Sequence, residues 1–173
     1  MRYAGLLCND VVNGEGVCVS YWAQGCGRHC RECHNPQTWD FNGGIEDSTP
    51  NIILTILRAL RANGVKRNFS ILGGEPLCLE NIQTTTQIVL AIRHQCPSVK
   101  IFVWTGYTYE ELEARAETDS YLNYLLRAID VLIDGPYLKS HRDITLKWRG
   151  STNQRIIDMR RTIENKQIVL YDK

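Results

Sequence analysis

The chain has 173 residues, the size of one domain, and its composition of 43% apolar and 23% charged residues is that of an ordinary globular protein. Its net charge of +1 gives no reason to expect a protein that binds nucleic acid or a membrane surface. No apolar run is long enough for a transmembrane helix, and residues 1–7 lack the pattern of a signal peptide. We therefore expect a cytoplasmic protein with a single domain over 1–173.

Predicted strands and helices alternate along the chain. Residues 16–23 are rich in β-branched and aromatic side chains and predict the first strand. Thr49 is the expected N-cap of a helix with proline at its first position, and this helix ends near residues 63–64. Thr108 and Glu111 predict a capping box for a later helix. Further predicted strands are 68–72, 99–104, 129–133 and 167–171, and further predicted helices are 79–95 and 121–128.

This alternation predicts an α/β fold with a parallel sheet and crossover helices. The chain is too short for a closed eight-fold barrel, which needs about 250 residues, so we expect a compact partial (β/α) barrel of parallel strands. Ligands of such sheets bind beyond the carboxyl ends of the strands. The sequence features that follow the predicted strands are the cysteine cluster after residue 23, Gly73-Gly74-Glu75, Trp104-Thr105-Gly106-Tyr107 and Asp134.

Seven cysteines cannot all pair within one chain, and a reducing compartment disfavours disulfides. Cys26, Cys30 and Cys33 lie within a stretch of eight residues. Clustered thiolates are soft ligands that favour zinc or an iron–sulfur cluster. Three thiolates on a [4Fe–4S] cluster leave one iron open, where a substrate can coordinate. The remaining cysteines are expected to be small buried residues: they are Cys8, Cys18, Cys78 and Cys96.

The alternative metal is structural zinc, which takes four protein ligands. A fourth ligand would then come from His29, His34 or Cys18. The spacing of the cysteines alone leaves both zinc and iron–sulfur open.

Two motifs together resemble those of the radical S-adenosylmethionine (SAM) enzymes. The Cys26-x3-Cys30-x2-Cys33 spacing is similar to the cluster motif of that family, and Gly73-Gly74-Glu75-Pro76 is similar to its second motif. The residue before the last cysteine is often aromatic in the family, whereas here it is Glu32. The resemblance implies one [4Fe–4S] cluster on three cysteines, with SAM at the fourth iron and its amino group facing the glycines. It also implies the partial barrel expected above.

Further segments narrow the resemblance to glycyl-radical activating enzymes that act on anaerobic ribonucleoside-triphosphate reductase, over about residues 3–157. These segments are Cys33-His34-Asn35-Pro36-x2-Trp39-Asp40, Trp104-Thr105-Gly106-Tyr107, the stretch 130–135 and Arg149-Gly150-Ser151-x-Asn153-Gln154-Arg155. Such enzymes take one electron from a low-potential donor such as flavodoxin. They cleave SAM to methionine and a 5′-deoxyadenosyl radical, which removes hydrogen from a glycine on the glycyl-radical subunit of the reductase.

The resemblance also implies roles for particular residues. Asp134 is the candidate catalytic side chain, facing SAM or the incoming glycine; the alternative is an ordinary residue of an Asp-Gly-Pro turn. The segment 139–173 is an expected partner-docking extension, because Lys139 to Lys166 contains eight basic and three acidic residues, although a solvated face is the simpler interpretation. The SAM site is expected to be lined by Glu32, Cys33, His34, Gly73, Gly74, Glu75 and Thr105.

Three alternative functions remain. A pyruvate formate-lyase-type activating enzyme has Asp-x-Lys after the corresponding strand, but here Asp134 precedes Gly135 and Pro136, and lysine follows only at 139. A 7-carboxy-7-deazaguanine synthase is a more distant relative with a similarly small fold. From a different class, a non-catalytic zinc-binding interaction module would bind one zinc and have no affinity for SAM. The glycine motif after a strand argues against that module.

Overall fold

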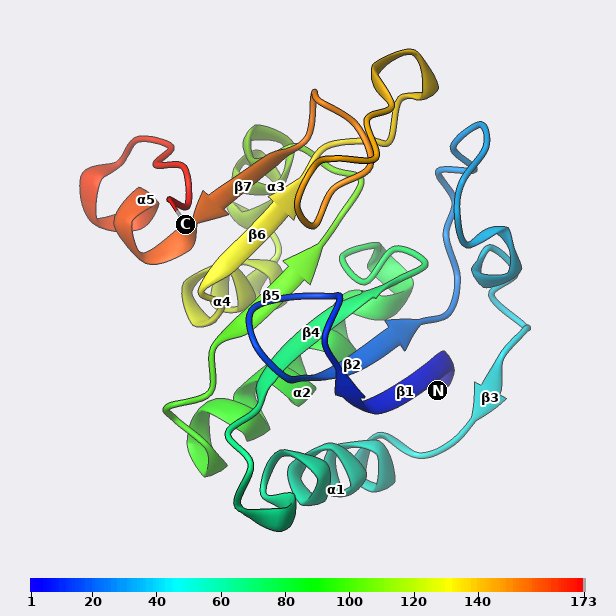
Figure 1. The fold of residues 1–173 in the computed structure, drawn as a ribbon, viewed down its shortest axis with the longest axis vertical. Coiled ribbons are helices and arrows are strands. Elements are labelled where there is room, and N and C mark those ends of the chain that lie inside the picture. The colour runs from blue at the N-terminus through cyan, green and yellow to red at the C-terminus, as the bar shows by residue number, and fades with distance from the viewer. Residues whose placement is uncertain (173) are drawn as a thin grey trace.

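The structure, a computed structural model that describes residues 1–172, contains a seven-stranded mixed sheet in the order β3-β1-β2-β4-β5-β6-β7 (Figure 1). The strands are β1 (Arg2–Asp10), β2 (Cys18–Ala23), β3 (Ile45–Glu46), β4 (Asn68–Gly73), β5 (Ile101–Trp104), β6 (Val131–Asp134) and β7 (Arg155–Asp158). The helices are α1 (Thr49–Leu60), α2 (Leu79–Gln95), α3 (Tyr109–Ala116), α4 (Ser120–Ala128) and α5 (Met159–Asn165). Short 3-10 turns are η1 (Pro36–Thr38), η2 (Ala62–Gly64) and η3 (Lys139–His141). Residue 173, the last of the expected basic segment, lies outside the described residues.

The centre of the sheet is parallel, as the alternation of strands and helices predicts. Strands β2, β4, β5 and β6 run parallel to one another, whereas β1 and β3 on one side and β7 on the other are antiparallel to their neighbours. The sequence analysis did not predict β1, β3 or β7. The expected last strand over 167–171 is wrong, because Leu170 forms only a single bridge to Ile157.

The observed helices begin at local signals close to the predicted ones. Thr108 caps α3, and both hydrogen bonds of its capping box with Glu111 are present. The predicted N-cap Thr49 is wrong by one residue: Ser48 is the cap, and its hydroxyl accepts a hydrogen bond from the Asn51 N–H. Helix α2 has the predicted bounds.

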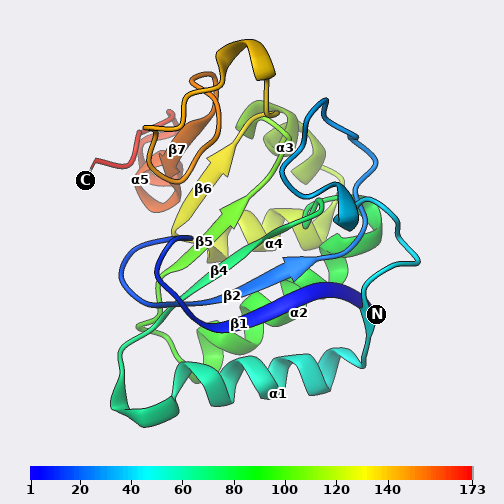
Figure 2. The ribbon, with the colours of Figure 1, turned by 45° about the vertical axis from the view of Figure 1, so that its right-hand side comes forward.

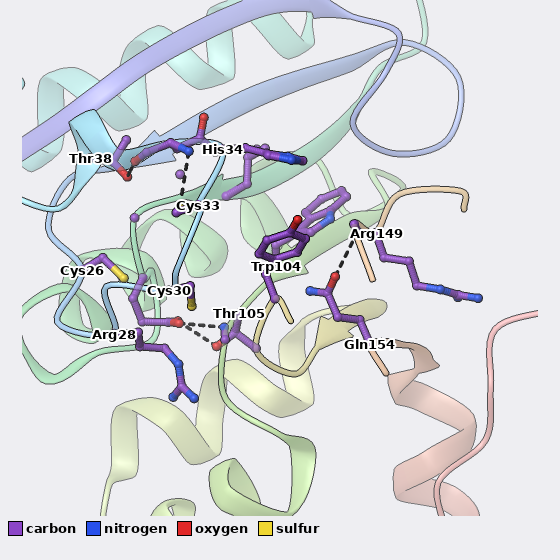
Figure 3. A pocket seen from close by; sticks show the side chains of 18 of the residues that line it. Cys26, Arg28, Cys30, Cys33, His34, Thr38, Trp104, Thr105, Arg149 and Gln154 are labelled. Carbon is purple, nitrogen blue, oxygen red and sulfur yellow. Dashed lines mark hydrogen bonds between the residues drawn. The ribbon is translucent and has the colours of Figure 1, made fainter. Parts of the chain in front are cut away.

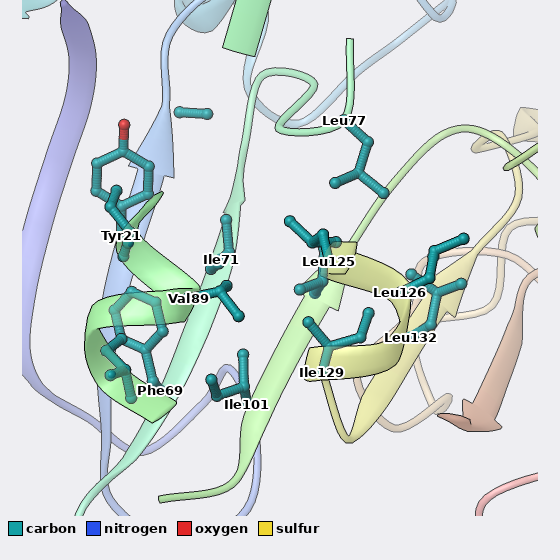
Figure 4. Packing of buried hydrophobic residues seen from close by; sticks show 14 of the residues in the cluster. Tyr21, Phe69, Ile71, Leu77, Val89, Ile101, Leu125, Leu126, Ile129 and Leu132 are labelled. Carbon is teal, nitrogen blue, oxygen red and sulfur yellow. The ribbon is translucent and has the colours of Figure 1, made fainter. Parts of the chain in front are cut away.

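The main hydrophobic core lies between the sheet and the helices that cover one of its faces (Figure 2). Strand residues Phe69, Ile71 and Ile101 pack among Val89 of α2 and Leu125 of α4, all fully buried (Figure 4). Burying side chains of this size contributes roughly 1.5–3 kcal/mol each, so this layer holds the parallel strands in place. Over residues 1–172, no helix is long and apolar enough to cross a membrane.

The other face of the sheet is covered by chain segments rather than by helices. The β1–β2 loop packs there through Gly14, where a Cβ atom would lie 2.8 Å from the sulfur of Cys18 and 2.9 Å from the hydroxyl oxygen of Ser70. A smaller cluster around Phe102 packs with Trp104 and Trp148 near the C-terminal segment.

Candidate functional site

A cavity of about 420 Å³ lies at the carboxyl ends of the parallel strands (Figure 3). The cysteine loop after β2 borders one side of it, and the rest of the wall comes from residues at and after the ends of β4, β5 and β6 and from the β1–β2 loop. The strand-end motifs therefore lie together, as a parallel sheet requires. Among the expected site residues, the cavity is lined by Cys26, Cys30, Cys33, His34, Gly73, Gly74, Glu75 and Thr105, whereas Glu32 and Asp134 are not in its wall.

The cysteine loop is fixed at its base by the chain that returns after it. The backbone N–H of Gly25 donates to the carbonyl of Thr38 over 2.8 Å, and that of Cys26 donates to the carbonyl of Trp39 over 3.0 Å. Cys26 is buried, and burial raises the pKa of its thiol. Cys30 and Cys33 are half-buried, so the three thiols lie at different depths along one wall.

The three cysteines at the cavity are candidate ligands of an iron–sulfur cluster. Within the described 172 residues, no three His, Cys, Asp or Glu side chains come close enough to hold one ion. A cubane cluster instead binds each thiolate through a different iron, so its ligands stand further apart than those of zinc. Trp39 also lines the cavity, and its buried indole N–H has no hydrogen-bond partner in the described structure.

At the end of β4, Gly73 and Gly74 lie so close to neighbouring backbone atoms that a side chain would not fit at either position. Gly73 has φ +104°, and a Cβ atom on it would lie 2.7 Å from the carbonyl oxygen of Ala23. A Cβ atom on Gly74 would overlap the carbonyl oxygen of Gly25 and lie 3.0 Å from that of Thr38. The N–H of Gly74 donates to Ala23 over 2.8 Å. The glycine motif therefore supports the cysteine loop, a role that the sequence analysis did not assign to it.

Glu75 joins the ends of two strands. Its buried carboxylate accepts hydrogen bonds from the hydroxyl of Thr105 at 2.7 Å, from the N–H of Gly106 at 2.8 Å and from the N–H of Leu77 at 3.1 Å. Burial raises the pKa of Glu75, while these donors act against that rise. The Thr105 hydroxyl also accepts from the N–H of Tyr107 at 3.1 Å. Both side chains are engaged with the protein, so they shape the wall of the cavity.

Asp134 lies behind the cavity, in an ion-pair network. Its side chain is 1% exposed, and it accepts from the N–H of Tyr109 at 2.8 Å and from Nε of Arg155 at 3.0 Å. Arg155 also binds both carboxylate oxygens of Glu110, at 2.9 and 2.7 Å. This network ties β6 to β7 and to the start of α3. The backbone of Gly135, the next residue, then reaches the cavity.

The C-terminal segment 136–154 contacts the cysteine loop. Lys139 forms an ion pair with Glu32, and this hydrogen bond lowers the pKa of the Glu32 carboxyl. The rings of His34 and Tyr137 lie 5.4 Å apart. The segment supplies part of the cavity wall through Tyr137, Leu146, Trp148, Arg149, Gly150 and Gln154. The sequence signal for this contribution is the Arg149–Arg155 motif, which the sequence analysis used only as part of the resemblance.

Comparisons with known proteins agree on one family. Residues 12–157 match a family model described as a 4Fe-4S single cluster domain. An anaerobic ribonucleoside-triphosphate reductase-activating protein of Pasteurella multocida is 37% identical over 155 residues, which is 89% of this chain and 95% of that protein. The chain belongs to the family of anaerobic ribonucleoside-triphosphate reductase-activating proteins. The member from Escherichia coli K12 is 35% identical over 92% of this chain and 100% of its own length, and that of phage T4 is 31% identical over 90% and 93%.

Membership in this activating-protein family decides between the metals that the cysteine spacing leaves open. The matched model describes a 4Fe-4S domain and spans all three clustered cysteines, so this activating protein carries an iron–sulfur cluster and not structural zinc. Of the side chains considered as a fourth zinc ligand besides His34, Cys18 is buried beneath Gly14, away from the cavity, and the His29 ring packs against Trp39 at 4.7 Å.

The ion-pair network behind the cavity makes this activating protein sensitive to acid. Arg155 lowers the pKa of Glu110 from 4.5 to about 2 in the folded state. A carboxyl whose folded pKa is depressed contributes stability above its unfolded pKa and loses that contribution as the pH falls toward the folded value. The native chain should have a larger free energy of unfolding than a Glu110→Gln variant. We expect this difference to shrink as the pH falls from about 4.5 to about 2. Urea unfolding of the cluster-free proteins at a series of pH values measures this, and a pH-independent difference would contradict it.

Proposed function

We propose that this chain activates an anaerobic ribonucleoside-triphosphate reductase by generating the glycyl radical on the glycyl-radical subunit of that reductase. The observation that carries the proposal is the single cavity bordered by three clustered cysteines and the glycine motif, in a chain whose relatives bear the activating-protein name. Cys26, Cys30 and Cys33 hold the cluster, and SAM occupies the remaining space. The sheet corresponds to the partial (β/α) barrel of radical SAM enzymes.

When bound, the cluster and SAM supply a one-electron reductive cleavage that yields methionine and the 5′-deoxyadenosyl radical. The chain's own residues hold and enclose these groups. Three thiolates leave one iron without a protein ligand. The backbone of Gly73 and Gly74 borders the space for the methionine part of SAM.

The size of the cavity supports SAM as its second occupant. A volume of about 420 Å³ lies within the range of roughly 300–1,000 Å³ that small-molecule sites have. Tyr137 and Trp148 of the C-terminal segment exclude water from one side, which protects a reactive radical from side reactions. A glycine is a fitting target because it has no side chain to obstruct its Cα. We place the reaction in the cytoplasm, with a low-potential donor such as flavodoxin supplying the electron.

The test is anaerobic reconstitution with iron and sulfide, followed by reduction with dithionite and addition of SAM. We expect 5′-deoxyadenosine in solution. When the reductase of the same organism is also present, we expect a glycyl-radical signal in its electron paramagnetic resonance spectrum. Bound zinc without SAM cleavage would overturn the proposal. SAM cleavage without a radical on this reductase, but with one on pyruvate formate-lyase, would replace the proposed target.

A further inference from the structure

A second cavity of about 700 Å³ lies beside the first. It is a groove between residues 28–31 of the cysteine loop and residues 136–140 of the C-terminal segment, and we call it the outer groove. Arg28, Cys30 and Tyr137 line both cavities, so these three residues form a shared wall. Cys30 therefore faces the proposed reaction chamber on one side and a surface groove on the other.

The outer groove is strongly basic, although the chain as a whole is nearly neutral. Arg28, Arg31 and Lys139 line it, and Arg142 and the acidic Glu32 flank it, which together gives +3 in a chain of net charge +1. The one acidic side chain, Glu32, is paired with Lys139. Arg31 and Arg142 are exposed, and both are close enough to lower the pKa of Glu32. The carboxylate of Asp143, next along the chain, is held by the N–H and hydroxyl of Thr145 at 2.8 and 2.7 Å.

The proposed function requires two different macromolecules, the reductase and an electron donor, to approach this protein. The two need different kinds of access. A glycine of the reductase must reach the cavity where SAM lies, because hydrogen transfer needs contact between the reacting atoms. Electron transfer needs no such contact, so an electron can reach the cluster from the side of Cys30 that faces the outer groove. The outer groove meets the second requirement, since it reaches Cys30 without passing through the cavity that the glycine has to enter.

We propose that the outer groove is the docking site of an acidic one-electron carrier protein, a low-potential flavin or iron–sulfur protein. This inference rests on the proposed function. In the step at this site the carrier loses one electron and the cluster gains one, and no proton or atom is transferred. Basic side chains around the groove raise the rate of encounter with an acidic partner and orient it, and salt screens this attraction.

The test compares two variants with the same change in charge. Arg31→Glu with Arg142→Glu reverses two exposed charges, one in the lining of the groove and one beside it; neither residue lines the first cavity. Arg58→Glu with Arg160→Glu reverses two exposed charges on α1 and α5 and serves as the control. The cluster is reduced by flavodoxin hydroquinone, an acidic flavoprotein, in stopped-flow experiments at low and high salt.

At low salt we expect the groove variant to be reduced by flavodoxin about tenfold more slowly than the native protein. The dependence of its rate on salt should be nearly flat. Its iron content, its reduction by dithionite and its dithionite-driven formation of 5′-deoxyadenosine should stay unchanged, and the control variant should behave like the native protein.

Several results would overturn the docking site. Unchanged reduction of the groove variant by flavodoxin would do so, as would equal slowing of the control variant. Loss of glycyl-radical formation with dithionite as the donor, while flavodoxin still reduces the cluster normally, would assign the groove to the reductase instead. A native protein that takes electrons from dithionite yet does not cleave SAM would overturn the proposed function, and the docking site with it.

Discussion

Replacing Cys30 with alanine is expected to reduce 5′-deoxyadenosine formation to the background of cluster-free protein. Cys30 lies in the wall of the cavity with Cys26 and Cys33, and the described structure offers no fourth cysteine there to substitute for it. A cluster that loses one of three thiolates loses the protein ligand of one iron. The iron and sulfide content after reconstitution should fall with the activity, and both are measured on the same sample.

Cys8→Ala is the matched control for this variant. Cys8 is exposed on β1, away from the cavity, and a surface substitution of this kind changes stability by roughly 0.5 kcal/mol or less. Its cluster content and SAM cleavage should equal those of the native protein. Full activity in Cys30→Ala would refute the assignment of this cysteine as a ligand, and equal losses in both variants would point to a general effect of removing thiols.

Replacing Gly74 with alanine is expected to lower the free energy of unfolding by about 3 kcal/mol or more, at the upper end of the usual cost of overpacking. The new Cβ atom would overlap the carbonyl oxygen of Gly25 and lie 2.9 Å from its carbonyl carbon. These are backbone atoms, which cannot turn aside as the end of a flexible side chain can. The cysteine loop would have to move, so SAM affinity should fall as well.

Gly27→Ala gives the comparison, because Gly27 belongs to the same loop but a Cβ atom on it would meet nothing within 4 Å. Urea unfolding of both cluster-free variants measures the difference in stability. Isothermal titration of the reconstituted proteins with SAM under anaerobic conditions measures affinity. Equal stability of the two variants would mean that the Gly25–Gly74 contact is not as tight as the structure has it.

The features that local sequence encodes could be predicted. The parallel strands β2, β4, β5 and β6 are mostly apolar runs followed by turn residues, and because they run in the same direction their carboxyl ends bring the strand-end motifs together. The capping box at Thr108 depends on residues three apart. Strand β1 could not be found in the same way, since irregularities between Tyr3 and Gly5 and between Leu7 and Asp10 interrupt its alternation.

Other features depend on contacts between distant parts of the chain. The ion pair of Glu32 with Lys139 joins residues 107 positions apart, so neither side chain has a local signal for it. The sequence placed Asp134 correctly at the end of a strand, but the arginine that binds it comes from β7, 21 residues later. The positions of Tyr137 and Trp148 also depend on distant parts of the chain. They line the cavity only because the C-terminal segment folds back over the sheet.

The late position of that segment has a consequence for how the protein matures. All three clustered cysteines and the four parallel strands lie before residue 135, whereas the wall that contains Tyr137, Trp148 and Gln154 is translated afterwards. Without that segment, the side of the cavity that Tyr137, Trp148 and Gln154 line would be open to solvent. A bound cluster can therefore be enclosed only after the chain beyond Gly135 has folded back over the cysteine loop.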